Sequence, residues 1–520
     1  MTKPKFLQPP WLELIIMLAA VALSVIGFLI ISFLSQPNVS AQMNYGMIAL
    51  WLIAFFLISF AIALISVLAG IGGGILFTPI MMAFTPVNSL VIRATGLIVA
   101  MFGGLISTGV FMKKGLGNLK ICIILSISQG IGALLGARYA IVAADMFGDL
   151  GEGMMRIFLG GILALVAVNF LAADKRFNWP NIRNVDKITG WMGLKSTYYE
   201  ESEKKSYSYR VTRILLGLAL VLFVGFIGGF FGIGAGWAIT PIQNIALGVP
   251  LKVAAANSGI ILGMVNCVAV WPYMLAGGII PLFVLPWLSG KVTGGYLGAL
   301  VFVKAKVTVI RFILSGIMIY TSFQLITDGL VKFHFIPKIP SRISLAIFLI
   351  IMVFDAILLF RAQRKEEKKE AGEIIMNGML PYMDKSQLHY GKTAHWITGV
   401  SCLISLVTPF FILLFPNKNH LNEVLLFDAI LKGKNPAEIW KAAGIQFKSG
   451  DFWPLFIKNF FTPDGLAAFG VALGCSVTLW ALIPAVCQFT KKKEYFYVGV
   501  SIFLMALIVL AMSGIVNMAG

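Results

Sequence analysis

Long apolar runs separated by short polar segments dominate this chain of 520 residues. A run of about 20 apolar residues is long enough to cross a bilayer as a helix. The pattern therefore predicts an all-α polytopic membrane protein. The expected spans are 11–34, 47–69, 91–112, 119–143, 154–172, 211–231, 253–276, 279–302, 308–327, 342–360, 395–415, 465–487 and 495–517, with two further interrupted runs at 71–89 and 232–250.

Two segments rich in glycine and proline interrupt this pattern at matching positions. Residues 70–79 read GIGGGILFTP, and residues 232–241 read GIGAGWAITP, at a shift of 162 residues. Glycine exposes backbone and allows close packing, whereas proline removes a hydrogen-bond donor. Unpaired backbone at membrane depth must be covered by protein or line a cavity. Broken segments at matching positions of two halves therefore indicate the substrate site of a transporter.

The likeness between the two halves extends beyond the broken segments. Each half contains five predicted crossings if its broken segment crosses once. Since five is odd, the second half is inverted relative to the first. The further matches are RATG at 93–96 with ANSG at 256–259, GALLGA at 132–137 with GGYLGA at 294–299, and MRIFLGGI at 155–162 with IRFILSGI at 310–317.

These features divide the chain into segments and orient it in the membrane. Basic residues in short loops mark the cytoplasmic side, which places the N-terminus in the cytoplasm and the acidic segment 144–153 outside. We expect the cell inner (cytoplasmic) membrane. The segments are an N-terminal extra span at 1–45, repeat 1 at 46–172, a cytoplasmic loop at 173–210, repeat 2 at 211–330 and C-terminal extra spans at 331–520, which include a cytoplasmic charged segment at 361–392 and an external loop at 416–464.

Composition agrees with this class of protein. Hydrophobic residues make up 59% of the chain and charged residues 12%. The net charge of +19 is explained by basic residues that flank spans, and it does not indicate a nucleic-acid partner. The five cysteines show no ligand or disulfide spacing. We therefore expect no metal, cofactor or catalytic group, and a lipid bilayer as the environment.

On these motifs the chain resembles the TauE/SafE sulfite exporter family, also called TSUP transporters. The resemblance rests on the two broken segments, on RATG and NSG downstream of them, and on the order of the apolar runs. It covers roughly residues 46–330. The resemblance implies two inverted repeats and transport, mostly export, of small sulfur-containing anions such as sulfite or organosulfonates.

Lys291 is the leading candidate for contact with an anion. It lies in the middle of the run 279–302, in LSGKVTGG, and ionisable side chains deep in a span are functional candidates by default. The repeat alignment places Gln129, in SISQGIG, at the same position of repeat 1. Both side chains are expected to face one central site. The alternative is that Lys291 pairs with a carbonyl or lines packed protein.

Helix N-termini and neutral donors add to this site. The starts of the half-helices that follow the two glycine segments offer free N–H groups and a partial positive charge. For each threonine or serine candidate listed below, a hydrogen bond from the hydroxyl to the backbone of its own helix is an equal alternative to substrate binding. Near span ends, Arg93, Arg156 and Arg311 favour headgroup contacts; the last two are also matched gate or ion-pair candidates. The further substrate-binding candidates are Gly72, Gly73, Gly74, Gly234, Ala235, Gly236, Thr78, Thr240, Thr95, Asn257 and Ser258, with Pro79 and Pro241 as gate or structural residues.

Neither repeat has an Asp or Glu at mid-span. This pattern favours an anion that moves down its own gradient, because an interior-negative potential drives anions out of the cell. The predicted function is a secondary transporter that exports sulfur-containing anions by alternating access. An anion channel remains an alternative, and an importer of the same anions would use the same residues. A membrane enzyme with the 416–463 loop as its active face is disfavoured, since the loop lacks a nucleophile–base arrangement.

Overall fold

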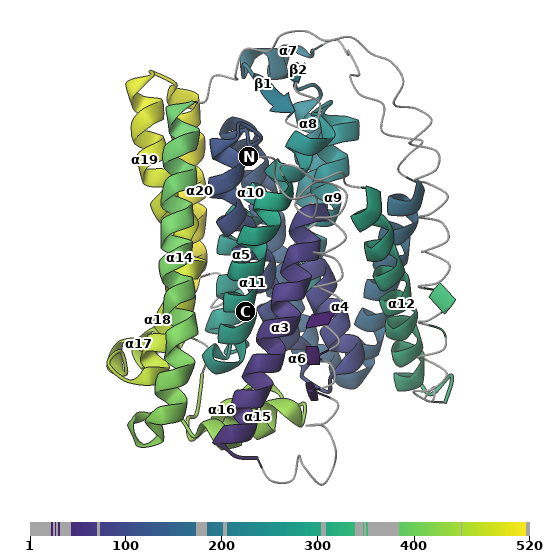
Figure 1. The fold of residues 1–520 in the computed structure, drawn as a ribbon, viewed down its shortest axis with the longest axis vertical. Helices are drawn as coiled ribbons and strands as arrows, with labels where there is room; N and C mark the ends of the chain where they lie inside the picture. Colours follow the sequence, from purple (N-terminus) through teal and green to yellow (C-terminus); the bar gives the residue numbers. More distant parts are fainter. Residues whose placement is uncertain are drawn as a thin grey trace, which may run out of the picture.

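The computed structural model describes residues 43–69, 73–172, 185–200, 205–302, 308–337, 384–448 and 450–515, together with isolated positions at 22–31 and 347–351 (Figure 1). Most of the predicted spans 11–34 and 342–360 lies outside the described residues, and so does Gly72.

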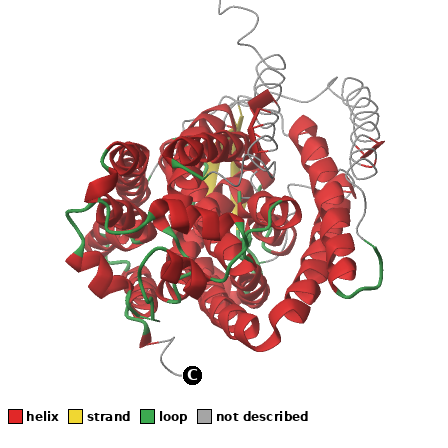
Figure 2. Ribbon diagram, turned by 90° about the horizontal axis from the view of Figure 1, so that it is seen from below, coloured by secondary structure: helices red, strands yellow, loops and turns green. Residues whose placement is uncertain are grey.

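The described chain is almost entirely helical, with one short hairpin (Figure 2). Its elements are α3 (Tyr45–Ala69), α4 (Gly74–Phe84), α5 (Ser89–Lys113), α6 (Leu119–Ala172), α7 (Lys187–Trp191), β1 (Lys195–Glu200), β2 (Lys205–Arg210), α8 (Ile214–Phe231), α9 (Gly236–Pro241), η3 (Ile242–Ala246), α10 (Leu251–Leu275), α11 (Pro281–Phe302), α12 (Thr308–Lys332), α14 (Lys385–Leu414), η4 (Pro416–Lys418), α15 (Glu423–Leu431), α16 (Pro436–Ala442), α17 (Phe452–Lys458), α18 (Pro463–Cys475), α19 (Val477–Lys491) and α20 (Tyr495–Met512).

The prediction of an all-α polytopic membrane protein is confirmed. Seven described helices are long and apolar enough to cross a membrane, or eight if α18 and α19, bent by 41°, form one span. Large apolar side chains remain exposed on the outer helices: Phe158 on α6, Phe223 on α8 and Phe410 on α14 are each 64–65% exposed. Such surfaces require lipid or a partner to cover them.

Two helices form the centre of the bundle. In both α5 and α10, 94% of the apolar window is buried, against 33% in α14 and α20. Around this pair the helices of the two predicted repeats interlock, because α11 packs on α3 and α8 packs on α6. Each repeat therefore supplies helices to both sides of the bundle.

The acidic segment 144–153, expected to be a loop between two spans, is helical, so the loop prediction is wrong. It lies within α6, which runs without interruption from Leu119 to Ala172. The segment 144–153 contains no proline that would break the helix, and the helix continues through its three glycines although glycine has low helix propensity. Hydrophobicity indicates which residues lie in the membrane and which lie in water. It does not indicate whether a polar segment between two apolar runs is a loop or a continuous helix.

The cytoplasmic loop expected at 173–210 contains ordered structure that the sequence analysis missed. Strands β1 and β2 pair antiparallel, from Lys195 opposite Arg210 to Glu200 opposite Lys205. Tyr198 and Tyr207 stack with ring centroids 5.6 Å apart. Tyrosine and β-branched residues favour strands, and the alternation of tyrosine with polar residues was the available signal.

The C-terminal helices pack against the repeats. Helix α14 lies against α5 and α11, and also contacts α18 and α19. It begins at Lys385, where the Asp384 side chain accepts a hydrogen bond from Ser386 N–H. The last residues of the predicted charged segment 361–392 are therefore the first turns of this helix. The predicted external loop 416–464 folds into η4, α15, α16 and α17.

Candidate substrate site

The two broken segments meet inside the bundle. The hydroxyl of Thr78, in α4, donates a hydrogen bond of 2.8 Å to the carbonyl of Gly232 at the second break. A Cβ added at Gly74 would lie 2.6 Å from the carbonyl oxygen of Ile233. Gly232 and Gly234 both have φ of 66°, a conformation that glycine adopts without strain. Glycine therefore allows both the turn and the close approach.

Lys291 lies next to the first break. It is completely buried in the middle of α11, and its Nζ donates a hydrogen bond of 2.5 Å to the Ser66 hydroxyl on α3. A Cβ added at Gly73 would be 2.2 Å from Nζ, and one added at Gly103 would be 2.3 Å from Cε. The lysine is thus enclosed by α3, α5 and the start of α4.

The start of α4 adds positive potential at the same point. Gly73 is the N-cap of α4 and supplies no side-chain hydrogen bond, and the first turn contains no acidic residue. Exposed N–H groups give a helix N-terminus a partial positive charge. Within the described residues, no acidic side chain forms an ion pair with Lys291. A buried cation without a counterion is costly, so this place favours an anion.

Gln129, the residue that the repeat alignment pairs with Lys291, packs against α8. It is completely buried in α6, and its amide nitrogen and oxygen have no hydrogen-bond partner among the described residues. A Cβ added at Gly225 of α8 would lie 2.9 Å from Gln129 Cγ. The recorded contacts of Lys291 and Gln129 therefore involve different helices, and no described contact joins the two side chains.

The second half-helix is shorter than the first. Ala235 is the N-cap of α9, again without a side-chain hydrogen bond. Helix α9 contains Gly236, Thr240 and Pro241, and passes directly into the π-helical turn η3. In α4, by contrast, Pro79 lies inside a helix of 11 residues.

Several predicted donors already have partners within the protein. Thr95 bonds the Val91 carbonyl of its own helix at 2.8 Å. Ser258 bonds the Gly236 carbonyl at 3.1 Å, which ties α10 to α9. The Asn257 amide donates a hydrogen bond of 2.9 Å to Gln243 Oε1 and accepts one of 2.8 Å from the backbone N–H of Asn118. These side chains hold the broken region together in this conformation.

The three arginines have different surroundings. Arg93 is completely buried, so the expected headgroup contact is wrong; NH1 donates to the Phe230 carbonyl, 3.3 Å away, near the end of α8. Last-turn carbonyls attract a cation. Arg156 forms an ion pair of 3.4 Å with Asp328, which joins α6 to α12. Arg311 lies in α12, and its side chain is outside the described residues.

The structure adds site residues that the sequence analysis did not select. Ser66 and Gly103 lie in apolar runs in which a single small residue carries little signal. Tyr273 is a further residue without a sequence signal. Its hydroxyl donates a hydrogen bond of 2.9 Å to the Gly229 carbonyl, beside the Arg93 contact. Only tertiary packing reveals these partners.

The segment 416–464 contains a buried carboxyl group with a raised pKa. Glu423 in α15 is only 1% exposed. Burial, reinforced by the negative charge of Asp464, raises the pKa of Glu423 to about 9. Among the described residues, no group of His, Cys, Asp and Glu is arranged to hold a metal ion.

These features define a multi-pass membrane protein with a lysine enclosed in its interior beside the first break. The model of the sulfite exporter TauE/SafE family matches residues 54–325, more than half of the chain. The chain therefore belongs to this family and is a membrane transporter. A further family model, which carries no functional description, matches residues 386–515.

Two relatives have similar lengths of match. The probable membrane transporter protein YunE of Bacillus subtilis is 28% identical over 271 residues, which are 51% of this chain and 93% of that protein. A probable membrane transporter protein of Haemophilus influenzae is 25% identical over 274 residues, 51% of this chain and 93% of the relative. No solved structure matches the chain.

Proposed function

We propose that this protein is a secondary transporter that exports small sulfur-containing anions, sulfite or organosulfonates, by alternating access around Lys291. The observation that carries the proposal is the position of this buried lysine at the uncapped start of α4. Membership of the sulfite exporter family supports the substrate class.

The enclosure of Lys291 fits a carrier in an occluded conformation. A carrier alternates between states in which the site opens to one side. The bound anion would interact with the Lys291 ammonium and the first N–H groups of α4, since charge-assisted hydrogen bonds are the strong ones. Gln129 and the second break would supply neutral donors when the repeats move.

The membrane potential would drive export. An interior-negative potential favours exit of an anion by about 2.3 kcal/mol per charge per 100 mV. We place the protein in the cytoplasmic membrane with its N-terminus inside. Under this orientation, export needs no coupled ion.

The test is uptake and counterflow by the purified protein in liposomes. Sulfite, sulfate, thiosulfate, sulfoacetate and taurine are compared, with chloride as the control anion. We expect saturable flux of at least one sulfur-containing anion, counterflow of that substrate, and a change in flux when the imposed potential is reversed. Flux without saturation or counterflow would indicate a channel. Flux unaffected by the potential would contradict electrogenic export, and no flux of any sulfur-containing anion would overturn the proposal.

A further inference from the structure

The segment 416–462 forms a compact unit, here called the cap, between α14 and α18. It contains η4, α15, α16 and α17; Figure 1 shows α15 and α16 at the end of the bundle near the start of α3, and α17 beside α18. The helices have defined starts: the side chains of Asn422 and Asn435 accept hydrogen bonds from Leu425 N–H and Glu438 N–H. The cap is an ordered structure with specific contacts to both repeats.

The cap is attached to repeat 2 by hydrogen bonds and a stacked ring pair. Trp440 Nε1 donates to the Gly277 carbonyl at 2.8 Å, and Gly450 N–H donates to the Leu275 carbonyl at 3.0 Å. Both acceptors lie at the end of α10. Trp453 stacks on Trp271 of the same helix, with centroids 5.5 Å apart and planes 19° apart.

The cap meets repeat 1 only through packing among the described residues. Gly433, with φ of 70°, approaches the α4–α5 connection so closely that an added Cβ would lie 2.3 Å from the Pro86 carbonyl oxygen. Phe427 lies against Phe55 of α3, with centroids 6.4 Å apart. No hydrogen bond joins the cap to the described part of repeat 1. The attachment to repeat 2 is therefore directional and polar, and that to repeat 1 is not.

A column of aromatic rings continues from the cap toward Lys291. Phe55 stacks on Trp287 of α11 at 4.8 Å, and Trp287 meets Phe77 of α4 edge-on at 4.7 Å. All these rings, with Phe427, are completely buried. Trp287 lies four residues, about one helical turn, before Lys291. The rings thus fill the space between the cap and the lysine, and they come from both repeats.

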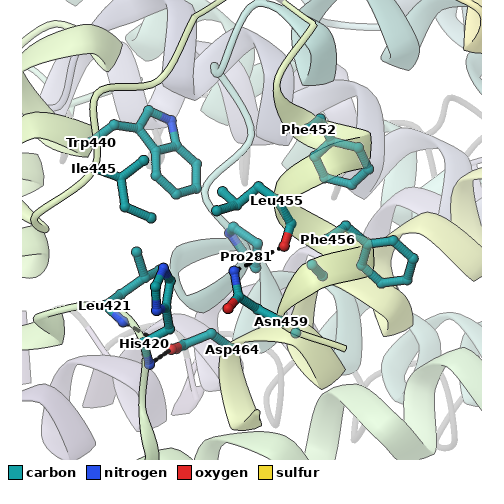
Figure 3. Close-up of a pocket in the computed structure, with 12 residues that line it drawn as sticks. Pro281, His420, Leu421, Trp440, Ile445, Phe452, Leu455, Phe456, Asn459 and Asp464 are labelled. Atoms are coloured by element: carbon teal, nitrogen blue, oxygen red, sulfur yellow. Dashed lines mark hydrogen bonds between the residues drawn. The ribbon is translucent and has the colours of Figure 1, made fainter. Parts of the chain in front are cut away.

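A small cavity of ≈ 40 Å³ lies between the cap and the start of α18, with one residue of repeat 2 in its lining. Figure 3 shows Trp440, Phe452 and Phe456 around it, with Pro281 at the start of α11 on its wall. Asp464 borders it and accepts hydrogen bonds from the backbone N–H groups of His420 and Leu421. Protein interiors are normally close-packed, so this void leaves side chains room to rearrange where the cap is attached.

We propose that the cap is the gate on its side of the membrane. It stays attached to repeat 2 at Leu275 and Gly277, and it separates from repeat 1 at Pro86 and Phe55 when the Lys291 site opens to that side. The inference rests on the proposed function for alternating access, and it does not depend on which anion is carried.

A disulfide between the cap and repeat 1 tests the separation. The variant Pro86→Cys/Gly433→Cys suits this purpose, because the added Cβ at position 433 would lie 4.0 Å from Cβ of residue 86, within the range of disulfides. The reporter is Ser66→Cys, beside Lys291, labelled by a membrane-impermeant methanethiosulfonate in vesicles of each orientation. Exposed Cys487 is replaced by serine to remove background labelling.

We expect labelling from the cap side to fall at least tenfold when the disulfide forms, and to recover when the disulfide is first reduced and the reducing agent is removed before the reagent is added. The control disulfide, Ala94→Cys/Gly278→Cys, joins the two repeats directly, since the Cβ atoms would lie 3.6 Å apart. It should block labelling as well. Labelling that persists with the cap disulfide but not with the control would overturn the gate.

A second variant covers the case in which residue 433 does not tolerate cysteine. Phe427→Ala removes the cap ring that contacts Phe55, and should raise labelling from the cap side at least threefold. The matched control, Phe456→Ala, changes a ring that faces the cavity and should leave labelling unchanged. Unchanged labelling in Phe427→Ala contradicts the proposal. If labelling changes as expected in these variants but the protein transports no sulfur-containing anion, only the proposed substrate is overturned.

Discussion

The two broken segments share a backbone pattern, yet different side chains pack beside them. At the first break, Lys291 lies against Gly73 and bonds Ser66. Gln129, which the repeat alignment pairs with Lys291, lies against Gly225 of α8, seven residues before Gly232, and its amide has no partner among the described residues. One half has an ionisable lysine at this aligned position, and the other has a neutral amide. The similar backbones therefore carry side chains of different chemistry.

The half-helix at the first break is also the longer of the two. Helix α4 has 11 residues, whereas α9 has six and continues as a π-helical turn. The longer helix aligns more peptide dipoles, and it starts beside the lysine. Under the proposed function, the anionic group of the substrate would bind at the first break, and the second break would contribute neutral contacts.

Removal of the lysine side chain should lower anion flux more than any other change at the two breaks. Lys291→Ala should lower anion flux by about 100-fold, because a hydrogen bond to a charged group contributes up to about 3 kcal/mol. Flux in liposomes is measured at matched protein levels. The control is Ser289→Ala on the same helix, whose hydroxyl bonds only carbonyls of its own helix. If the flux of Lys291→Ala equals that of the wild type, Lys291 does not contribute to substrate binding.

A methyl group at the first break should have the next largest effect. Gly73→Ala places Cβ 2.2 Å from the lysine Nζ, and overpacking of a closed site costs about 1–3 kcal/mol. The apparent affinity for the anion should fall roughly tenfold. Ala235→Gly, at the matching position of repeat 2, should change it less than threefold. Equal effects at the two positions would contradict the asymmetry between the breaks.

Gln129→Leu should change stability and transport in opposite directions. Replacement of a buried amide that lacks partners by an apolar side chain should stabilise the protein by about 1 kcal/mol. Flux should fall severalfold, because a neutral donor is lost. Thermal unfolding in detergent and flux in liposomes provide the two measurements. If flux is unchanged, Gln129 belongs to the packed interior and not to the transport path.

The smallest effects concern the hydroxyls near the first break. Thr78→Val removes the bond to the Gly232 carbonyl that joins the two breaks, and should cost about 1–2 kcal/mol of stability. Thr95→Val removes a bond within one helix and should cost less than half as much. Thermal unfolding compares the pair directly. A larger loss from Thr95→Val would show that the contact between breaks is not the stronger restraint.

Much of the architecture was predictable because lipid imposes simple rules. Apolar runs marked the spans, and the matched glycine segments marked the two breaks, which meet at Thr78 and Gly232. The burial of Lys291 followed from its position in the middle of a span.

Other features depend on tertiary contacts that hydrophobic patterns do not report. Ser66 and Gly103 form the lysine site only because α3 and α5 pack on α11. The burial of Arg93 depends on a partner 137 positions away, Phe230. The continuity of α6 and the hairpin at 195–210 depend on backbone hydrogen bonds, and the contacts of the cap arise from residues far apart in the chain.

The most direct test of the central claim is anion binding by the purified protein. Calorimetric titration with the transported anion compares wild type, Lys291→Gln and Gln129→Leu. The account predicts that Lys291→Gln abolishes measurable binding, whereas Gln129→Leu still binds with an affinity reduced only severalfold. Binding by Lys291→Gln with the affinity of the wild type would contradict the claim that the charge beside the first break holds the substrate.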